Sequence, residues 1–211
     1  MGYIELKQFL SDKEALLIAV SKKRSVEQIM ALYDKGQRHF GENRVSELLE
    51  KKAALPDDIM WHMIGNLQRK KIKKIAPFIS MIHSVDNATL AESINEAGAR
   101  AERVIDVLLQ VKIAQEESKS GFSIEELKAQ ILDLDKLDHT QVRGLMGMAT
   151  YTDDADIVRK EFKSLYDLFQ DANTLINSPA DFDTLSMGMS GDYRIAVEEG
   201  STMVRIGSLL F

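Results

Sequence analysis

The feature that most constrains the fold is an alternation of short apolar runs with amphipathic segments along the whole chain. The runs predict eight strands, at residues 15–21, 38–42, 59–65, 80–85, 103–113, 140–148, 183–188 and 202–206. Between them, apolar residues recur at three- and four-residue steps, which predicts seven helices. This order predicts an α/β fold, a (β/α)8 TIM barrel, with a doubly wound open sheet as the alternative.

The chain has 211 residues, which suits one such barrel, and we expect a single domain over residues 1–211. Its net charge is -6 without a long block of like charge, so we expect neither a nucleic-acid nor a membrane partner. The basic stretch Arg69–Lys74 is interpreted as a solvated helix face. The absence of cysteine excludes disulfides and thiolate metal ligands. No signal-peptide-like core is seen at the N-terminus, and we expect a cytoplasmic protein.

Local signals support the element order. Asp86-Asn87 and Thr152-Asp153-Asp154 offer helix N-caps. Glycines are expected to end helices at Gly36, Gly98 and Gly200. Few residues follow the last strand, so the segment from Ile4 to Leu10 is predicted to fill the place of an eighth helix, and its deletion is predicted to lower stability.

Polar and small residues follow the predicted strands, where the functional groups of parallel barrels gather. Lys22 follows the first strand and presents a primary amine, which Schiff-base chemistry with an aldehyde cofactor requires, although a solvated loop lysine is the alternative. The seventh and eighth strands lead into Ser186–Asp192 and Arg205–Ser208. Glycine and serine there let backbone N–H groups and hydroxyls approach an anion, which predicts a phosphate cradle.

Eight short runs, spread over nearly the whole chain, carry a resemblance to a known family. They are Ile18–Lys22, His39–Asn43, Trp61–Gly65, Ile82–Asp86, Ser118–Phe122, Arg143–Met146, Leu185–Ser190 and Gly200–Gly207. With these runs in the same order, the chain resembles the pyridoxal phosphate homeostasis protein family, which is similar to the barrel domain of fold-type III enzymes such as alanine racemase.

The resemblance implies pyridoxal 5′-phosphate (PLP) as cofactor, held by Lys22 as a Schiff base. It implies Ser190, Gly207 and Ser208 at the phosphate, with Ser186 or Met187 nearby. Arg205 would approach the pyridine nitrogen; a guanidinium can hydrogen-bond that atom but does not readily protonate it, which makes the ring a weaker electron sink. The remaining implied site residues are Asn43, His62 and Ser84, with His83 on a neighbouring strand end.

The first functional hypothesis is a non-enzymatic monomer that buffers PLP and passes it to apoenzymes. The alternative is an amino-acid racemase, which needs two bases on opposite faces of the substrate carbon. In alanine racemase the second base comes from an added domain, so this chain would have to recruit Tyr33, Tyr151, Tyr193 or a histidine. A third hypothesis, a phosphosugar-binding barrel without PLP, explains the cradle but leaves Lys22 and Arg205 without a shared role.

Overall fold

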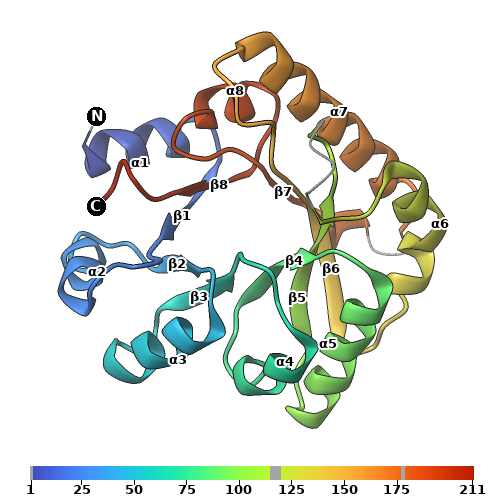
Figure 1. Ribbon diagram of the computed structural model, residues 1–211, viewed down its shortest axis with the longest axis horizontal. Coiled ribbons are helices and arrows are strands. Elements are labelled where there is room, and N and C mark those ends of the chain that lie inside the picture. Colours follow the sequence, from blue (N-terminus) through green and yellow to red (C-terminus); the bar gives the residue numbers. More distant parts are fainter. Residues whose placement is uncertain (1, 115–119, 177–178) are drawn as a thin grey trace.

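The computed structural model of the protein describes residues 2–114, 120–176 and 179–211, and it contains a closed barrel of parallel strands in chain order (Figure 1). Ser118 and Lys119, from one of the motif runs, lie outside the described residues. The strands are β1 (Leu16–Val20), β2 (His39–Glu42), β3 (Met60–Met63), β4 (Met81–Val85), β5 (Ile105–Val111), β6 (Thr140–Gly147), β7 (Thr184–Ser186) and β8 (Met203–Ile206). Because β1 pairs with both β2 and β8, the sheet has no open edge, which confirms the barrel and rules out the open sheet.

Helices surround the barrel and connect its strands (Figure 1). They are α1 (Tyr3–Ser11), α2 (Val26–Tyr33), α3 (Val45–Ala54), α4 (Arg69–Ile75), α5 (Ala88–Arg100), α6 (Ile124–Leu134), α7 (Ala155–Asn173) and α8 (Tyr193–Glu198), with a short 3₁₀ turn at Pro179–Asp181. The predicted strands are all present, although most are shorter than expected by one or two residues at an end, because apolar residues continue into the loops.

The predicted caps are present, but one predicted helix end is wrong. Asn87 caps α5 and Asp154 caps α7 through side-chain oxygens that accept backbone N–H groups. Gly36 and Gly200 follow helices with φ of +90° and +91°. Gly98 instead lies inside α5, where a Cβ would come within 2.7 Å of the His139 carbonyl oxygen. Glycine is needed there for close packing and not to end the helix.

Helix α1 lies between α8 and α2 in the ring, beside β8 and β1 (Figure 1). Leu6 and Leu10 are buried, and the Phe9 ring meets the Tyr193 ring of α8 edge-on with centroids 5.9 Å apart. The N-terminal segment therefore fills the place predicted for it. The loss of stability on its deletion stays a prediction.

The apolar core has two layers. The larger one lies between the sheet and the helices, as expected for parallel strands that are covered on their outer face. The smaller one fills the barrel with Ile18, Met81, Leu108, Met146 and Met203. Part of the barrel interior is therefore sealed by aliphatic and methionine side chains, and its polar residues occupy the remaining space.

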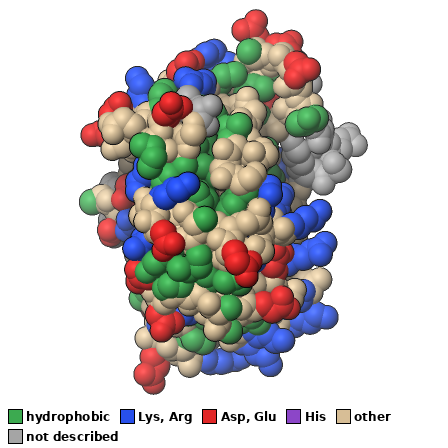
Figure 2. Space-filling view, turned by 90° about the vertical axis from the view of Figure 1, so that its left-hand side faces the viewer, with side chains coloured by type: hydrophobic (Ala, Val, Ile, Leu, Met, Phe, Trp, Pro, Cys, Tyr) green, Lys and Arg blue, Asp and Glu red, His purple; other side chains and the backbone are tan. Residues whose placement is uncertain are grey.

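The face of the barrel that carries both termini is not strongly charged (Figure 2). On this face, acidic and basic side chains are interspersed around apolar ones (Figure 2). Among the described residues, no helix is both long enough and apolar enough to span a membrane.

Candidate functional site

Lys22 is placed at the C-terminal mouth of the barrel by β1, which ends two residues earlier at Val20. Its side chain is exposed, whereas Ser21 before it is fully buried. Lys22 and Asn43, which follows β2, line a hollow of about 480 Å³. The other walls of this hollow come from Lys23, Arg24, Arg44 and Glu47. The Lys22 amine is thus accessible and surrounded mainly by cationic side chains.

The loops after β7 and β8, where the sequence predicts a phosphate cradle, contact each other. The Gly207 N–H donates to Ser190 Oγ over 3.4 Å, and the Arg205 N–H donates to the Gly188 carbonyl oxygen over 2.9 Å. Gly188 has φ of +95°, and a Cβ on it would lie 2.5 Å from the Ala196 Cβ, so the turn requires glycine. A Cβ on Gly207 would lie 3.3 Å from the Val20 Cβ. The cradle therefore lies against the end of the strand that carries Lys22.

The residues of the cradle do not contribute to the lining of the hollow beside Lys22. Ser190 is half-buried and Ser208 is exposed, so the hydroxyl groups of both loops can be reached from the mouth. The structure brings the amine and the residues of the predicted cradle to neighbouring strand ends of the barrel.

Arg205 carries a buried guanidinium on β8, only 5% exposed. Its Nη1 donates to the Ser186 carbonyl oxygen over 2.8 Å and to Ser186 Oγ over 2.6 Å, and its Nη2 donates to the Gly147 carbonyl oxygen over 3.0 Å. All of these acceptors are uncharged. Burial lowers the pKa of Arg205 to about 10, which still leaves the guanidinium protonated at neutral pH.

Three histidines, which we call the histidine row, connect this guanidinium with the inner wall of the barrel. His39 Nδ1 lies 3.0 Å from His62 Nε2, and His62 Nδ1 lies 2.9 Å from His83 Nε2. His83 Nδ1 lies 3.2 Å from Ser186 Oγ, the atom that Arg205 contacts. The row therefore runs from β2 through β3 and β4 to β7 and β8.

The rings of the row are neutral at pH 7. Burial lowers the pKa of His62 to about 3, with a smaller contribution from His39, and burial holds the pKa of His83 well below its ordinary value. Since Arg205 can only donate, the Ser186 hydroxyl can donate to His83, His83 to His62, and His62 to His39. In this arrangement each member of the chain that links Arg205 to His39 has a partner.

A second buried polar group lies behind Lys22, between the barrel wall and α3, and we call Lys51, Glu42 and Glu47 the ion cluster. Lys51 Nζ donates to Glu42 over 2.6 Å and to Glu47 over 2.7 Å. Burial raises the pKa of Glu42 despite its bonds from Lys51 and Ser21. One oxygen of Glu42, Oε2, is buried without a hydrogen-bond partner in the described part of the chain.

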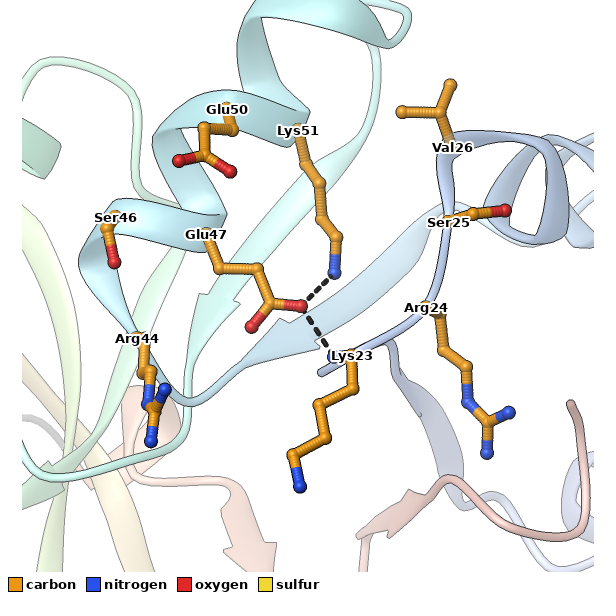
Figure 3. A pocket seen from close by; sticks show the side chains of 9 residues that line it. All are labelled: Lys23, Arg24, Ser25, Val26, Arg44, Ser46, Glu47, Glu50 and Lys51. Carbon is orange, nitrogen blue, oxygen red and sulfur yellow. Dashed lines mark hydrogen bonds and ion pairs between the residues drawn. The ribbon is translucent and has the colours of Figure 1, made fainter.

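Sequence reasoning missed the ion cluster, although Lys51 carried a signal. On α3 it falls three residues after Leu48 and six after Val45, on the stripe that faces the core. A lysine at such a position needs acidic partners, and Glu47 stands four residues before it. Next to the cluster, a cavity of about 610 Å³ opens between the starts of α2 and α3, where Figure 3 shows Lys51 and the Lys23 backbone both reaching Glu47.

Two further residues implied by the resemblance also have buried side chains. The Met187 side chain is buried in the core between sheet and helices, and its backbone pairs with Met203 and Ser201. Ser84 is buried, and its hydroxyl donates to the Gly65 carbonyl oxygen over 2.6 Å. A Cβ on Gly65 would lie 2.5 Å from the Asn43 carbonyl oxygen, so Ser84 supports the loop that packs against Asn43.

The tyrosines considered as second bases differ in position. The Tyr33 hydroxyl donates to Asp58 just before β3, at the opposite end of the barrel from Lys22. Tyr193 is buried against Phe9, whereas Tyr151, after β6, is 98% exposed. The histidines of the row are engaged with one another. Among these candidates, only Tyr151 has an exposed ring at the mouth that carries Lys22.

Comparison with known proteins places this geometry in a family. Residues 3–211 match the family described as alanine racemase, N-terminal domain. The chain is 39% identical over 198 residues to the pyridoxal phosphate homeostasis protein of Aquifex aeolicus, covering 93% of this chain and 86% of the relative. It is 37% identical to the human protein of the same name, covering 92% and 75%.

Solved structures agree with this assignment. PipY of Synechococcus elongatus PCC7942, solved with PLP bound, has a TM-score of 0.88 and 34% identity, with 98% of this chain and 97% of PipY covered. Without PLP, PipY has a TM-score of 0.91 and 36% identity over the same shares of both chains. Alanine racemase of Clostridium difficile 630 shares the fold at a TM-score of 0.75 and 17% identity, covering 97% of this chain and 55% of the racemase.

Proposed function

The chain belongs to the pyridoxal phosphate homeostasis protein family, and from this premise we propose that it binds PLP at the C-terminal mouth of its barrel, with Lys22 as the covalent anchor. We further propose that it stores PLP and delivers it to apoenzymes without catalysing a reaction itself. The observation that carries the proposal is the placement of an exposed amine after β1 beside a serine and glycine cradle after β7 and β8.

The residues at the mouth fit the three chemical parts of PLP. When bound, PLP supplies an aldehyde carbon that a primary amine attacks with release of water. Lys22 offers that amine, and Ser190, Gly207 and Ser208 offer hydroxyl and backbone donors for the phosphate. Arg205 is a buried cation whose hydrogen bonds go to uncharged acceptors, so it suits the pyridine nitrogen.

The other members of the proposed site would orient the ring. Asn43 lines the hollow beside Lys22, and His62 connects to Arg205 through His83 and Ser186. Ser186 holds the guanidinium directly, so its role in binding would be exerted through Arg205. We assign Ser84 and Met187 to support of the loops around the mouth and not to contact with PLP.

A carrier role is supported by the state of Arg205 and by the positions of two candidate second bases. Arg205 retains its proton, so it does not protonate the ring nitrogen or strengthen the ring as an electron sink. Two tyrosines that could act as a second base are occupied elsewhere, Tyr33 with Asp58 and Tyr193 within the core. PLP would therefore be held in a site suited to exchange, and the proposed recipients are PLP-dependent apoenzymes.

The binding proposal is tested by mixing the purified protein with PLP, reducing the mixture with borohydride and locating the pyridoxyl group by peptide mass spectrometry. We expect one pyridoxyl group on Lys22 in the native protein and none at this position in Lys22→Ala. Lys23→Ala is the matched control, because it removes the neighbouring lysine and should leave the modification intact. Stoichiometric trapping in Lys22→Ala would refute the assignment of Lys22.

The non-catalytic part is tested with the PLP-loaded protein and L-alanine in deuterium oxide. A racemase would exchange the Cα hydrogen for deuterium and form D-alanine, whereas we expect neither above the rate of free PLP. Enzyme-dependent exchange that Tyr151→Phe abolishes would establish the racemase alternative instead.

A further inference from the structure

The backbone on both sides of Lys22 is anchored, although the Lys22 side chain is exposed. On one side, the Ser21 carbonyl oxygen accepts a hydrogen bond from Lys51 Nζ over 2.6 Å. On the other side, the Lys23 N–H donates to Glu47 Oε1 over 2.5 Å. Both bonds are made by the ion cluster, which therefore holds the backbone of the residues immediately before and after Lys22.

The ion cluster joins three elements through one ammonium group. Lys51 Nζ donates to the Ser21 carbonyl at the end of β1, to Glu42 at the end of β2 and to Glu47 on α3. An ammonium group has three donors, and these contacts use all of them. The same Glu47 oxygen receives both Lys51 and the Lys23 N–H (Figure 3).

The anchored segment needs support from outside, because its backbone is strained. Lys23 has φ of +62°, in the left-handed region that residues other than glycine rarely adopt. Such a conformation persists where neighbouring contacts over-determine it. Here the contact is the bond from the Lys23 N–H to Glu47, which Lys51 holds in turn. The turn that aims Lys22 thus depends on a buried ammonium group on another element.

The charged groups of the ion cluster are also costly to bury. Lys51 is 5% exposed and Glu42 is fully buried, and burying two such groups costs solvation that hydrophobic residues of similar size would not lose. The Ser21 hydroxyl adds a further bond to Glu42 over 2.6 Å. At the end of β1, the bonds of the ion cluster all go to Ser21, the residue directly before Lys22.

We propose that Lys51 is a positioning residue for Lys22: through Ser21 and Glu47 it fixes the Ser21–Lys23 backbone so that the Lys22 amine is held ready for an aldehyde. This inference rests on the proposed role of Lys22 as the PLP anchor. The ion cluster then affects the rate at which PLP is bound and released at Lys22. Phosphate recognition depends instead on the separate cradle of Ser190, Gly207 and Ser208.

The test compares two ligands that differ at one group. PLP reports amine attack, measured as the rate constant for formation of the visible adduct after rapid mixing. Pyridoxine phosphate has an alcohol in place of the aldehyde, so its Kd, measured by calorimetry, reports binding at the cradle without covalent chemistry.

The variants are Lys51→Met and Glu42→Gln/Lys51→Met, the second of which removes the carboxylate that the first leaves buried and unpaired. Lys52→Met is the matched control, because Lys52 lies on the same helix as Lys51 but pairs with the exposed Asp57, which follows the helix.

We expect the double variant to form the adduct at least about tenfold more slowly, since small misplacements of a reacting group have large effects on rate. Its Kd for pyridoxine phosphate should stay within about twofold of the native value, and Lys52→Met should match the native protein in both measurements. An unchanged adduct rate in a folded double variant would overturn the proposal. An equal loss of adduct rate and pyridoxine phosphate affinity would also overturn it, since the whole site would then be affected.

A readout independent of PLP separates this inference from the proposed function. Hydrogen exchange of the Lys23 amide should be at least about tenfold faster in the double variant than in Lys52→Met, because its acceptor Glu47 has lost Lys51. Equal exchange in the two would refute the anchoring step. If native protein formed no adduct at Lys22, the proposed function would fail, and faster exchange would still establish the backbone anchor.

Discussion

The histidine row and the ion cluster are two buried groups of polar side chains that differ in charge. The row lies inside the barrel, is uncharged, and its hydrogen bonds are donated from ring to ring in the direction away from Arg205. The ion cluster lies between the barrel wall and α3 and contains an ammonium group and two carboxylates. One group is built from neutral partners, and the other is built from charges.

This difference determines what happens when one member is lost. Removal of a histidine leaves unpaired neutral atoms, whose cost is that of a broken hydrogen bond in a buried place. Removal of Lys51 leaves Glu42 as a buried charge, and Glu42 Oε2 already has no hydrogen-bond partner in the described part of the chain. The ion cluster should therefore be the more sensitive of the two to substitution, and the more responsive to compensation by a second change.

The largest effect on stability is expected for Lys51→Met. It should lower the free energy of unfolding by about 3–5 kcal/mol, because Glu42 stays buried without its cation. Urea denaturation followed by circular dichroism measures this loss. The double variant Glu42→Gln/Lys51→Met should recover most of it, and a double variant no more stable than Lys51→Met would show that the leftover charge is not the cause.

A smaller loss is expected for His83→Leu, a change near in volume that removes the ring between His62 and Ser186. It should cost about 2 kcal/mol, because His62 Nδ1 and Ser186 Oγ each lose a partner in a buried site. The same urea experiment applies. A loss as large as that of Lys51→Met would contradict the view that the row is neutral.

The two groups should also respond to pH with opposite signs. The pKa of His62 in the folded protein is about 3, below its ordinary value of about 6.5, so between these values the unfolded chain binds more protons. Stability from His62 is complete above pH 6.5 and falls as the pH is lowered through that window, by about 1 kcal/mol per pH unit. Urea titrations at pH 7 and pH 5 should show a shallower loss in His62→Leu than in the native protein.

Glu42 should have the opposite effect, a gain in stability as the pH falls. Its pKa is raised by burial, so above the ordinary range for a glutamate the folded chain binds the extra proton and gains stability as the pH falls. The variant Glu42→Gln lacks this gain. It should therefore lose more stability than the native protein between pH 7 and pH 5, and a shallower loss would indicate that Lys51 holds the pKa of Glu42 down.

The smallest effect is expected at the exposed end of α3. Lys52→Met removes the ion pair with Asp57, whose side chain is 97% exposed, and should change the free energy of unfolding by less than about 0.5 kcal/mol. The pair is screened by salt, so the difference should vanish at about 1 M sodium chloride. A loss near that of Lys51→Met would mean that the whole helix end, and not the buried cluster, carries the effect.

Much of the fold and part of the site could be predicted from the sequence, because local patterns encode them. Parallel strands covered on their outer face need continuous apolar runs, and those runs placed all of the strands to within a few residues. The end of the first run placed Lys22 at the mouth, whereas the phosphate cradle of Ser190, Gly207 and Ser208, which the resemblance implies, stays a prediction. Gly98 was misplaced because a glycine that permits close packing has the same local pattern as one that ends a helix.

The sequence by itself thus determined the barrel, the positions of its strand ends and the lysine presented there, since each depends on residues close together in the chain. Only the tertiary structure decided which polar residues meet. His83 and Ser186 are 103 residues apart and come together because the barrel closes, and Lys51 is buried because α3 packs its stripe on the ends of β1 and β2. Contacts of this kind depend on the register and closure of the sheet, which no local pattern encodes.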